Sequence, residues 1–208
     1  RGEPQLMYPK YHPRWAVMNV VRDIFNVRFI SRQTLDIPPD IDVLMLVNPK
    51  KFNEETLYAI DQYIMRGGNM LVLIDPFSET EVALGEVPYS IRPDIDKLLA
   101  NWGISFDTSH FVADTTLART VTHNEDGKSM QTKFPPWLAV NENYLSPEDP
   151  VTSAISTVNL AYAGTFNVIK KNENLTITPL IFSSKESELL QTIQGLTPDP
   201  AAMVGDFT

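Results

Sequence analysis

A strand, a helix and a second strand follow one another closely in the first half of the chain, and this order constrains the fold more than any other feature. Asp42–Val47 and Met70–Ile74 are nearly uninterrupted apolar runs, which are typical of parallel strands buried on both faces. Between them, Asn53 suits a helix N-cap, and Gly67 suits the left-handed position at a helix end. The order predicts a right-handed βαβ unit with its helix packed on a parallel sheet.

The predicted helix of this unit has one apolar stripe. Leu57, Ile60 and Ile64 recur at three- and four-residue spacings, which places their side chains on one side of a helix. Tyr63 lies beside them on the same side. We therefore expect Leu57, Ile60 and Ile64 to be buried against the sheet.

Further elements complete an α/β core over residues 1–115. Apolar residues recur with helical spacing in HPRWAVMNVVRDIF, and Val27–Ser31 follows as a short strand. The segment RPDIDKLLANWG predicts another helix, which Gly103 ends. The segment ISFDTSHFVAD, which follows this helix, is predicted to be a strand that ends at Asp114.

Residues 116–208 are predicted to be rich in β structure. The segment RTVTHNEDGKSMQTKF indicates a hairpin around Asp126-Gly127, a pair that favours a type I′ turn. The segments NLAYAGTFNVI and NLTITPLIF are strand-like, with a turn expected at Asn172-Glu173. This part is either a continuation of the same domain or a small appended subdomain.

Composition excludes several classes of function. Asp and Glu number 26 against 17 Lys and Arg, giving a net charge of −9 that repels nucleic acid. The chain has no cysteine, which excludes thiolate nucleophiles, Cys-based zinc sites and disulfides. It contains no apolar run of the roughly 18 residues that a membrane helix needs. We interpret the sequence as a soluble piece of a longer protein.

Four motifs, taken in order, resemble a known family. They are IPPDIDVLMLVNPKKFNEETLYAIDQYIMRGGNMLVLIDP, IDKLLANWGISFDTSHFVAD, FPPWLAVNENYLSPEDPVTSAISTVNLAYAG and LTITPLIFSS, and the resemblance as a whole covers roughly residues 14–184. The pattern resembles the GldG-like, gliding-motility-type auxiliary component of bacterial ABC transporters. The resemblance implies a periplasmic, extracytoplasmic domain of an inner-membrane protein, anchored by segments absent from this sequence.

The resemblance also implies a fold and a set of partners. The fold is similar to class I glutamine amidotransferases, which have a flavodoxin-like, mainly parallel sheet with helices on both faces. The implied partners are the permease and ATPase subunits of an ABC transporter, or other envelope proteins. The oligomeric state does not follow from the resemblance.

The residues themselves predict no catalytic centre. An amidotransferase-like frame uses a cysteine nucleophile activated by a histidine, and the chain has no cysteine. A serine nucleophile would sit in a G-x-S-x-G elbow, and the nearest match, GISFD at Gly103–Asp107, lacks the second glycine. We interpret that match as a turn into a strand, and we expect no enzymatic activity.

No metal site or cofactor is expected either. The three histidines, His12, His110 and His123, are not spaced as ligands on one helix or hairpin. His12 is interpreted as a helix-entry residue, His110 as a core or edge residue of a strand, and His123 as a solvated hairpin residue. The glycine pair after the predicted helix ends that helix rather than opening one, so it does not indicate a phosphate-binding loop.

Four residues at the carboxyl ends of the two predicted parallel strands are the candidate binding residues: Asn48, Lys50, Asp75 and Phe77. Open α/β sheets bind ligands at this edge, so their side chains could line a polar cleft. Alternatively, Asn48 and Asp75 are turn residues that bond nearby backbone amides. The turn interpretation is favoured, and both stay open.

Three hypotheses for function follow. The leading one is a non-catalytic extracytoplasmic auxiliary subunit of an ABC-type transport system that acts by protein–protein interaction or by binding a ligand or glycan. The second is a receptor module that captures a small ligand or glycan in the strand-end cleft. The third is a hydrolase on an amidotransferase-like frame with an unrecognised nucleophile.

Overall fold

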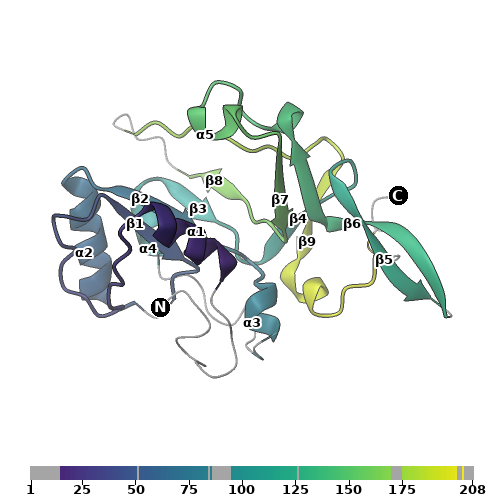
Figure 1. Cartoon of the computed structure of the whole chain (residues 1–208), viewed down its shortest axis with the longest axis horizontal. Coiled ribbons are helices and arrows are strands. Elements are labelled where there is room, and N and C mark those ends of the chain that lie inside the picture. Colours follow the sequence, from purple (N-terminus) through teal and green to yellow (C-terminus); the bar gives the residue numbers. More distant parts are fainter. Residues whose placement is uncertain are drawn as a thin grey trace. The chain divides into compact units, whose positions relative to one another are not determined.

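The computed structural model describes residues 15–50, 52–83, 85, 95–125, 127–169, 175–200 and 203. They form two compact units. Figure 1 shows the course of the chain in colour, from the N-terminus in purple to the C-terminal part in yellow. Unit 1 consists of the described residues within 1–74 and 93–98, and unit 2 of those within 75–92 and 99–208. The boundary expected near residue 115 stays a prediction.

Most helices of the described residues are short, and the longest is the one in the predicted βαβ unit. The helices are α1 (Ala16–Ile24), α2 (Glu54–Met65), α3 (Glu79–Ala83), α4 (Asp96–Asn101) and α5 (Pro150–Ser153), with 3-10 turns η2 (Glu142–Tyr144) and η3 (Thr192–Leu196).

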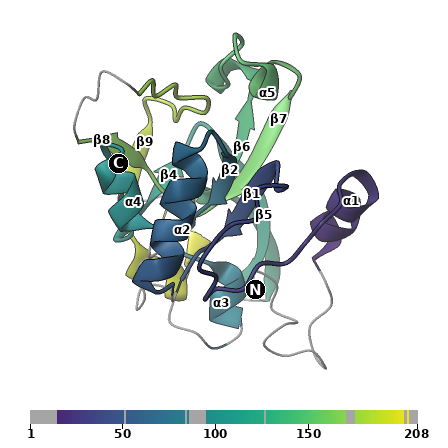
Figure 2. The same ribbon diagram turned by 90° about the vertical axis from the view of Figure 1, so that its left-hand side faces the viewer.

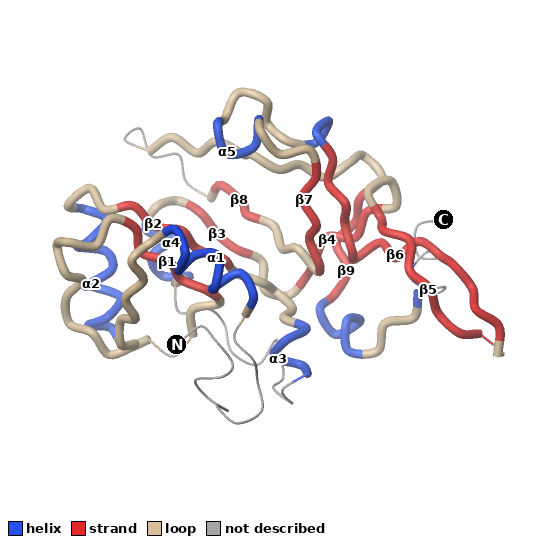
Figure 3. The backbone as a smooth tube through the Cα atoms, viewed as in Figure 1, coloured by secondary structure: helices blue, strands red, loops and turns tan. Residues whose placement is uncertain are grey.

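The strands of the described residues form small sheets, drawn in red in Figure 3. The strands are β1 (Val43–Val47), β2 (Asn69–Leu73), β3 (Ile104–Phe106), β4 (His110–Asp114), β5 (Ala118–Glu125), β6 (Lys128–Asn141), β7 (Thr157–Ala161), β8 (Phe166–Val168) and β9 (Ser187–Gln191). β1 pairs with β2, β3 with β8, and β4 with β9, while β5, β6 and β7 form one three-stranded sheet. Of these pairings, β1–β2 is parallel and the others are antiparallel.

The predicted βαβ unit is confirmed in unit 1. β1 and β2 are adjacent parallel strands in the register Val43–Asn69, and α2 connects them and lies beside them in both views (Figure 1, Figure 2). The side chain of Asn53 caps α2 by accepting the amide N–H of Thr56 at 2.9 Å. Gly67 has a φ of 89°, the left-handed conformation expected at the end of the helix.

The buried stripe of α2 differs from the prediction at one position. Leu57 and Ile60 are buried as expected, whereas Ile64 is half-buried. Tyr63 takes the buried place instead, and its hydroxyl donates to the carbonyls of Ile41 and Asn69 at 3.2 and 3.1 Å. These two carbonyls flank the starts of β1 and β2, so Tyr63 fixes the helix against the parallel pair.

The fold class is confirmed only in its coarse form. The chain is a mixed α/β protein, but the described sheets are small and largely antiparallel. The flavodoxin-like parallel sheet with helices on both faces is therefore unconfirmed. The strand predicted over Val27–Ser31 is wrong, because these residues lie outside any strand, with no partner strand to pair with among the described residues.

In the β-rich part, some predicted elements are confirmed. β5 and β6 form the hairpin expected there, with Glu125 paired to Lys128 across the turn that contains Gly127. The segment NLAYAGTFNVI supplies β7 and β8. The strand expected in NLTITPLIF is wrong as a strand, since only Ile181 forms an isolated bridge, to Leu145. The turn at Asn172-Glu173 lies outside the described residues.

β4 lies at the centre of unit 2 and is buried on both faces. Phe111 and Ala113 face one apolar cluster, and Val112 faces the other, because side chains alternate along a strand. The first cluster consists of Phe77, Phe111, Ala113, Phe134, Tyr162, Leu190 and Met203. The second consists of Val112, Leu117, Leu138, Val140 and Leu145.

Leu57→Ala is expected to lower the free energy of unfolding by about 2–3 kcal/mol, because it removes a buried side chain from a stripe that cannot fully collapse. Ile64→Ala is the matched control on the same helix and should cost less, about 1 kcal/mol, since its side chain is half-buried. Chemical denaturation of both variants measures the difference. Equal losses in the two variants would mean that Leu57 does not face the core.

Candidate functional site

Asn48 and Lys50 follow β1, as expected for residues at the carboxyl end of a parallel strand. Asn48 has a positive φ of 42° and donates its backbone amide to the carbonyl of Leu73 over 2.7 Å. Asparagine tolerates the left-handed region better than most residues, so this conformation is typical of a turn residue. Lys50 is half-buried, and its carbonyl accepts the guanidinium of Arg32 at 3.4 Å.

Asp75 and Phe77 follow β2 but belong to unit 2, whereas Asn48 and Lys50 belong to unit 1. Asp75 is exposed, and Phe77 is buried. The ring of Phe77 packs on Tyr162 with 4.6 Å between the ring centroids. Phe77 is thus a core residue of unit 2, and the convergence of all four side chains on one ligand stays a prediction.

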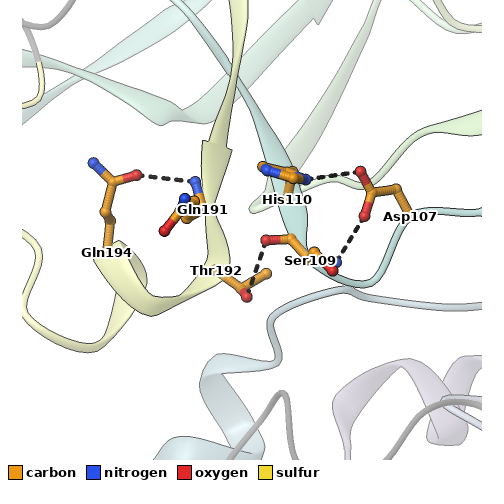
Figure 4. A network of polar contacts seen from close by, with 6 residues as sticks. All are labelled: Asp107, Ser109, His110, Gln191, Thr192 and Gln194. Atoms are coloured by element: carbon orange, nitrogen blue, oxygen red, sulfur yellow. Dashed lines mark hydrogen bonds and ion pairs between the residues drawn. The ribbon is translucent and has the colours of Figure 1, made fainter.

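A polar cluster in the turn between β3 and β4 joins Asp107, Ser109 and His110 (Figure 4). Oδ2 of Asp107 lies 2.8 Å from Nδ1 of His110, and Oδ1 accepts the amide N–H of Ser109 at 2.8 Å. Burial by itself would raise the pKa of Asp107, but the amide of Ser109 and the ring of His110 outweigh it and lower the pKa. The carboxylate therefore stays ionised and orients the imidazole.

The same cluster closes the end of the β4–β9 pair. Thr192 donates both its amide and its hydroxyl to the carbonyl of Ser109, at 2.9 and 3.2 Å. At the same end of β9, the side-chain oxygen of Gln194 accepts the amide of Gln191 at 2.9 Å (Figure 4). β3 and β4 are therefore two strands, where the sequence predicted one continuous strand over these residues. The available signal was Asp107 two residues before a serine, which is the spacing of an Asx-turn.

An Asp–His pair is an arrangement that general acid–base catalysis uses. Here both oxygens of Asp107 are engaged by residues of its own turn, one of them the backbone amide of Ser109. His110 begins β4 opposite Gln191, which confirms its expected place in a strand. The geometry accounts for the pair as a device that fixes the turn.

A buried carboxylate joins two segments that are far apart in the sequence. Asp114 is completely buried, and its Oδ1 accepts the amides of Thr116 and Leu117 at 2.9 and 3.0 Å. Ser184 donates its hydroxyl to Oδ1 at 2.8 Å and its amide to Oδ2 at 2.7 Å. The four donors satisfy the carboxylate, so Asp114 fixes the chain around Ser184 to the end of β4.

A second carboxylate lies at the edge of the aromatic cluster in unit 2. Burial raises the pKa of Glu79 on α3, and the indole of Trp137 partly opposes that rise. Burial also raises the pKa of Tyr162 to about 12, and the negative charge of Glu79 adds to the effect. Folding therefore makes Glu79 easier to protonate than it is in the unfolded chain.

Glu79→Gln is expected to stabilise the chain at neutral pH and to flatten its pH dependence. A carboxyl whose pKa is raised on folding stabilises the native state below its unfolded value of 4.5, and that stability is lost as the pH rises through the folded value. Glutamine removes this loss. Thermal unfolding from pH 4 to pH 8 measures it, and parallel profiles for wild type and variant would contradict the expectation.

The remaining histidines are His12 and His123. His12 lies outside the described residues, and His123 lies on β5, half-buried rather than solvated as expected. Within the part of the chain that the structure describes, no three His, Cys, Asp or Glu side chains are grouped so as to hold a metal ion.

A comparison with known families finds a match over nearly the whole chain. A family described as an ABC-type uncharacterized transport system matches residues 1–207. The chain belongs to this family. The family is one of auxiliary components of such transport systems. Two of the sequence motifs that resemble such auxiliary components are in contact in the structure. Asp114 is the last residue of IDKLLANWGISFDTSHFVAD, Ser184 is the last residue of LTITPLIFSS, and the two residues are hydrogen-bonded.

One relative of this chain is an uncharacterized protein of Borreliella burgdorferi, which is 26% identical to it over 170 residues. The alignment covers 79% of this chain and 32% of that protein, so the chain spans about a third of the relative's length. No solved structure matches the chain. Among the helices that the structure describes, none combines the length and the apolarity needed to cross a membrane.

Proposed function

We propose that this chain is a non-catalytic, extracytoplasmic part of an auxiliary subunit of an ABC-type transport system, and that it acts by contact with other proteins of the complex. The observation that carries the proposal is the match of residues 1–207 to the auxiliary-component family. A subunit that acts by contact needs a fixed surface rather than a reactive group.

The polar clusters of unit 2 support the non-catalytic part of the proposal. The carboxylates of Asp107 and Asp114 bond to backbone amides of their own turns. Such bonds hold turns in place and occupy the oxygens that a general base would offer to a substrate. The reactive side chains of these clusters thus have structural roles.

The finer assignments are proposals of the same kind. We propose a GldG-like, gliding-motility-type component located in the periplasm, with a domain related to the class I glutamine amidotransferases. Anchoring in the inner membrane would come from segments outside this sequence. The length of the relative supports this, because the aligned part makes up 32% of that protein.

A receptor module for a small ligand or glycan is the second candidate. Asn48 and Lys50 favour it, because both are half-buried side chains at the carboxyl end of a parallel strand. Ligands of open α/β sheets bind at that edge. Protein contact is preferred, because the backbone of Asn48 has the conformation of a turn residue.

Co-purification with the permease and ATPase subunits of an ABC transporter from the same organism tests the proposal. A tagged full-length protein is expected to retain both, in detergent and at physiological salt. A tagged protein that retains neither, although all three are expressed, would contradict the proposed role.

Asp75→Ala separates protein contact from ligand capture. We expect the variant to lose about 0.5–2 kcal/mol of stability, as on the loss of a side-chain-to-backbone cap, and to match wild type in binding no small molecule. Calorimetric titration of both proteins with a metabolite and glycan library is the measurement. A saturable ligand that binds wild type alone would establish the receptor module instead.

A panel of hydrolase substrates addresses the third hypothesis. We expect no turnover with the purified chain. Turnover that His110→Gln abolishes would show that the Asp107–His110 pair is catalytic and would overturn the non-catalytic assignment.

A further inference from the structure

β9 is an edge strand, and two backbone bonds show which of its residues face outward. Among the strands that the structure describes, β9 pairs with β4 alone. Just beyond one end of the pair, the amide of Thr192 donates to the carbonyl of Ser109 at 2.9 Å. Just beyond the other end, the amide of Thr115 donates to the carbonyl of Glu186 at 3.2 Å. Residues that bond across an antiparallel pair alternate with residues that do not, so three residues of β9 direct their amides and carbonyls away from β4: Ser187, Leu189 and Gln191.

The outward side of β9 is accessible. The side chain of Leu189 is 51% exposed, and Glu188 and Gln191 are exposed as well. Within the described part of the chain, no backbone hydrogen bond extends from Leu189 on that side. An edge with free amides and carbonyls is a template for a further strand, and in a purified sample that strand comes from a second copy of the chain.

The outward amide of Gln191 is already occupied. It donates to Oε1 of Gln194 at 2.9 Å, and Figure 4 shows the side chain of Gln194 directed from η3 toward the end of β9. The same bond caps the first turn of η3. Because this amide is also one of the outward donors of β9, one side chain both begins η3 and closes one end of the edge.

That end is the one that pairing between two copies needs. A twofold axis beside Leu189 would place this residue opposite itself and Ser187 of one copy opposite Gln191 of the other. In the antiparallel ladder, the amide of each Gln191 would then donate to the carbonyl of the opposite Ser187. The twofold forms this contact at both ends, so both copies would have to break their Gln194 bonds before the strands could pair in full.

We propose that the side chain of Gln194 is an edge guard, which keeps β9 of this chain from pairing with β9 of a second copy. Its oxygen satisfies the outward amide within the chain and so removes the donor that the second copy would use. This inference goes beyond the proposed function, because it concerns the contact of the chain with itself and needs no transporter subunit.

Amide hydrogen exchange of two variants tests the bond of the guard. Gln194→Met keeps the length of the side chain and removes the acceptor, whereas Gln194→Glu keeps an acceptor oxygen and is the matched control. In dilute protein, the amide of Gln191 should exchange about tenfold faster in Gln194→Met than in wild type or Gln194→Glu, because it loses its hydrogen bond. The outward amide of Leu189 is the internal reference and should exchange equally fast in all three proteins.

Sedimentation equilibrium of the same proteins tests the guarding. The dissociation constant of the dimer should be about tenfold lower for Gln194→Met than for wild type or Gln194→Glu, since each copy regains a backbone donor for pairing. Leu189→Lys in the Gln194→Met background should restore wild-type behaviour, because it places two like charges opposite each other at the centre of the paired strands.

Three results would overturn the proposal. Unchanged exchange of the Gln191 amide in Gln194→Met would show that Gln194 does not hold this amide. Faster exchange without stronger dimerisation would show that the edge needs no guard. Dimerisation of Gln194→Met that persists with Leu189→Lys would show that the copies meet through another surface.

Discussion

Asp114→Ala is expected to lower the free energy of unfolding by about 3–5 kcal/mol. The substitution removes the acceptor of four hydrogen bonds, two of them from Ser184 and one each from the amides of Thr116 and Leu117. The donors from Leu117 and Ser184 are buried, so water cannot replace the lost partner. Each buried donor left without a partner costs about 1–3 kcal/mol, and relaxation of the loop around Ser184 recovers part of the sum.

Two variants separate the carboxylate from its partners. Ser184→Ala keeps the backbone bond to Asp114 and loses the hydroxyl bond, so it should cost about 1–2 kcal/mol. Ser183→Ala next to it changes an exposed hydroxyl and should stay within about 0.5 kcal/mol of wild type. Chemical denaturation followed by tryptophan fluorescence, with Trp15→Phe as the common background so that only Trp102 and Trp137 of unit 2 contribute, measures these variants. An Asp114→Ala loss below about 1 kcal/mol would show that this link contributes little.

The correctly predicted elements are those specified by neighbouring residues. α2 has its cap at Asn53, its apolar stripe and its stop at Gly67 within one stretch of sequence. The cap and the stop are observed, and the stripe is observed except at Ile64, which is half-buried. The β5–β6 hairpin is likewise set by the two-residue turn that contains Gly127. Helices and hairpins close their hydrogen bonds locally, so local signals suffice.

The wrong predictions concern segments that would need a distant partner to become strands. Val27–Ser31 and the segment NLTITPLIF have β-forming residues, but strand propensity expresses packing against a partner rather than a property of the segment. In NLTITPLIF, the pairing is limited to Ile181 with Leu145. The sequence contains no local signal that tells which strand a segment will meet.

The candidate site shows the same division. Asn48 and Lys50 were found because strand ends can be read from an apolar run, and the structure places both after β1. The burial of Phe77 depends on Tyr162, which lies far along the chain. Asp114 and Ser184 bond across a separation of 70 residues, which no motif spacing announces.

Phe111→Ala is expected to lower the free energy of unfolding by about 3–5 kcal/mol, because it empties the centre of the aromatic cluster in unit 2. Phe111 is fully buried on β4, and its ring meets that of Tyr162 edge to face, with 5.0 Å between the centroids. Tyr162 in turn contacts the rings of Phe77 and Phe134 at 4.6 and 6.3 Å. A cavity at Phe111 therefore removes the contacts on one side of the Tyr162 ring, which also packs against Phe77 and Phe134.

Phe166→Ala is the matched control for this substitution. Its ring also contacts an aromatic neighbour, Phe106, at 5.1 Å, but the side chain is 58% exposed on the short strand β8. We expect a loss below about 1 kcal/mol for Phe166→Ala, since little buried surface disappears. Phe111→Leu keeps most of the volume and should cost about 1–1.5 kcal/mol. Chemical denaturation and the near-ultraviolet circular dichroism of the aromatic rings measure all three variants. Equal losses in Phe111→Ala and Phe166→Ala would show that burial at the centre of the cluster is not what holds unit 2 together.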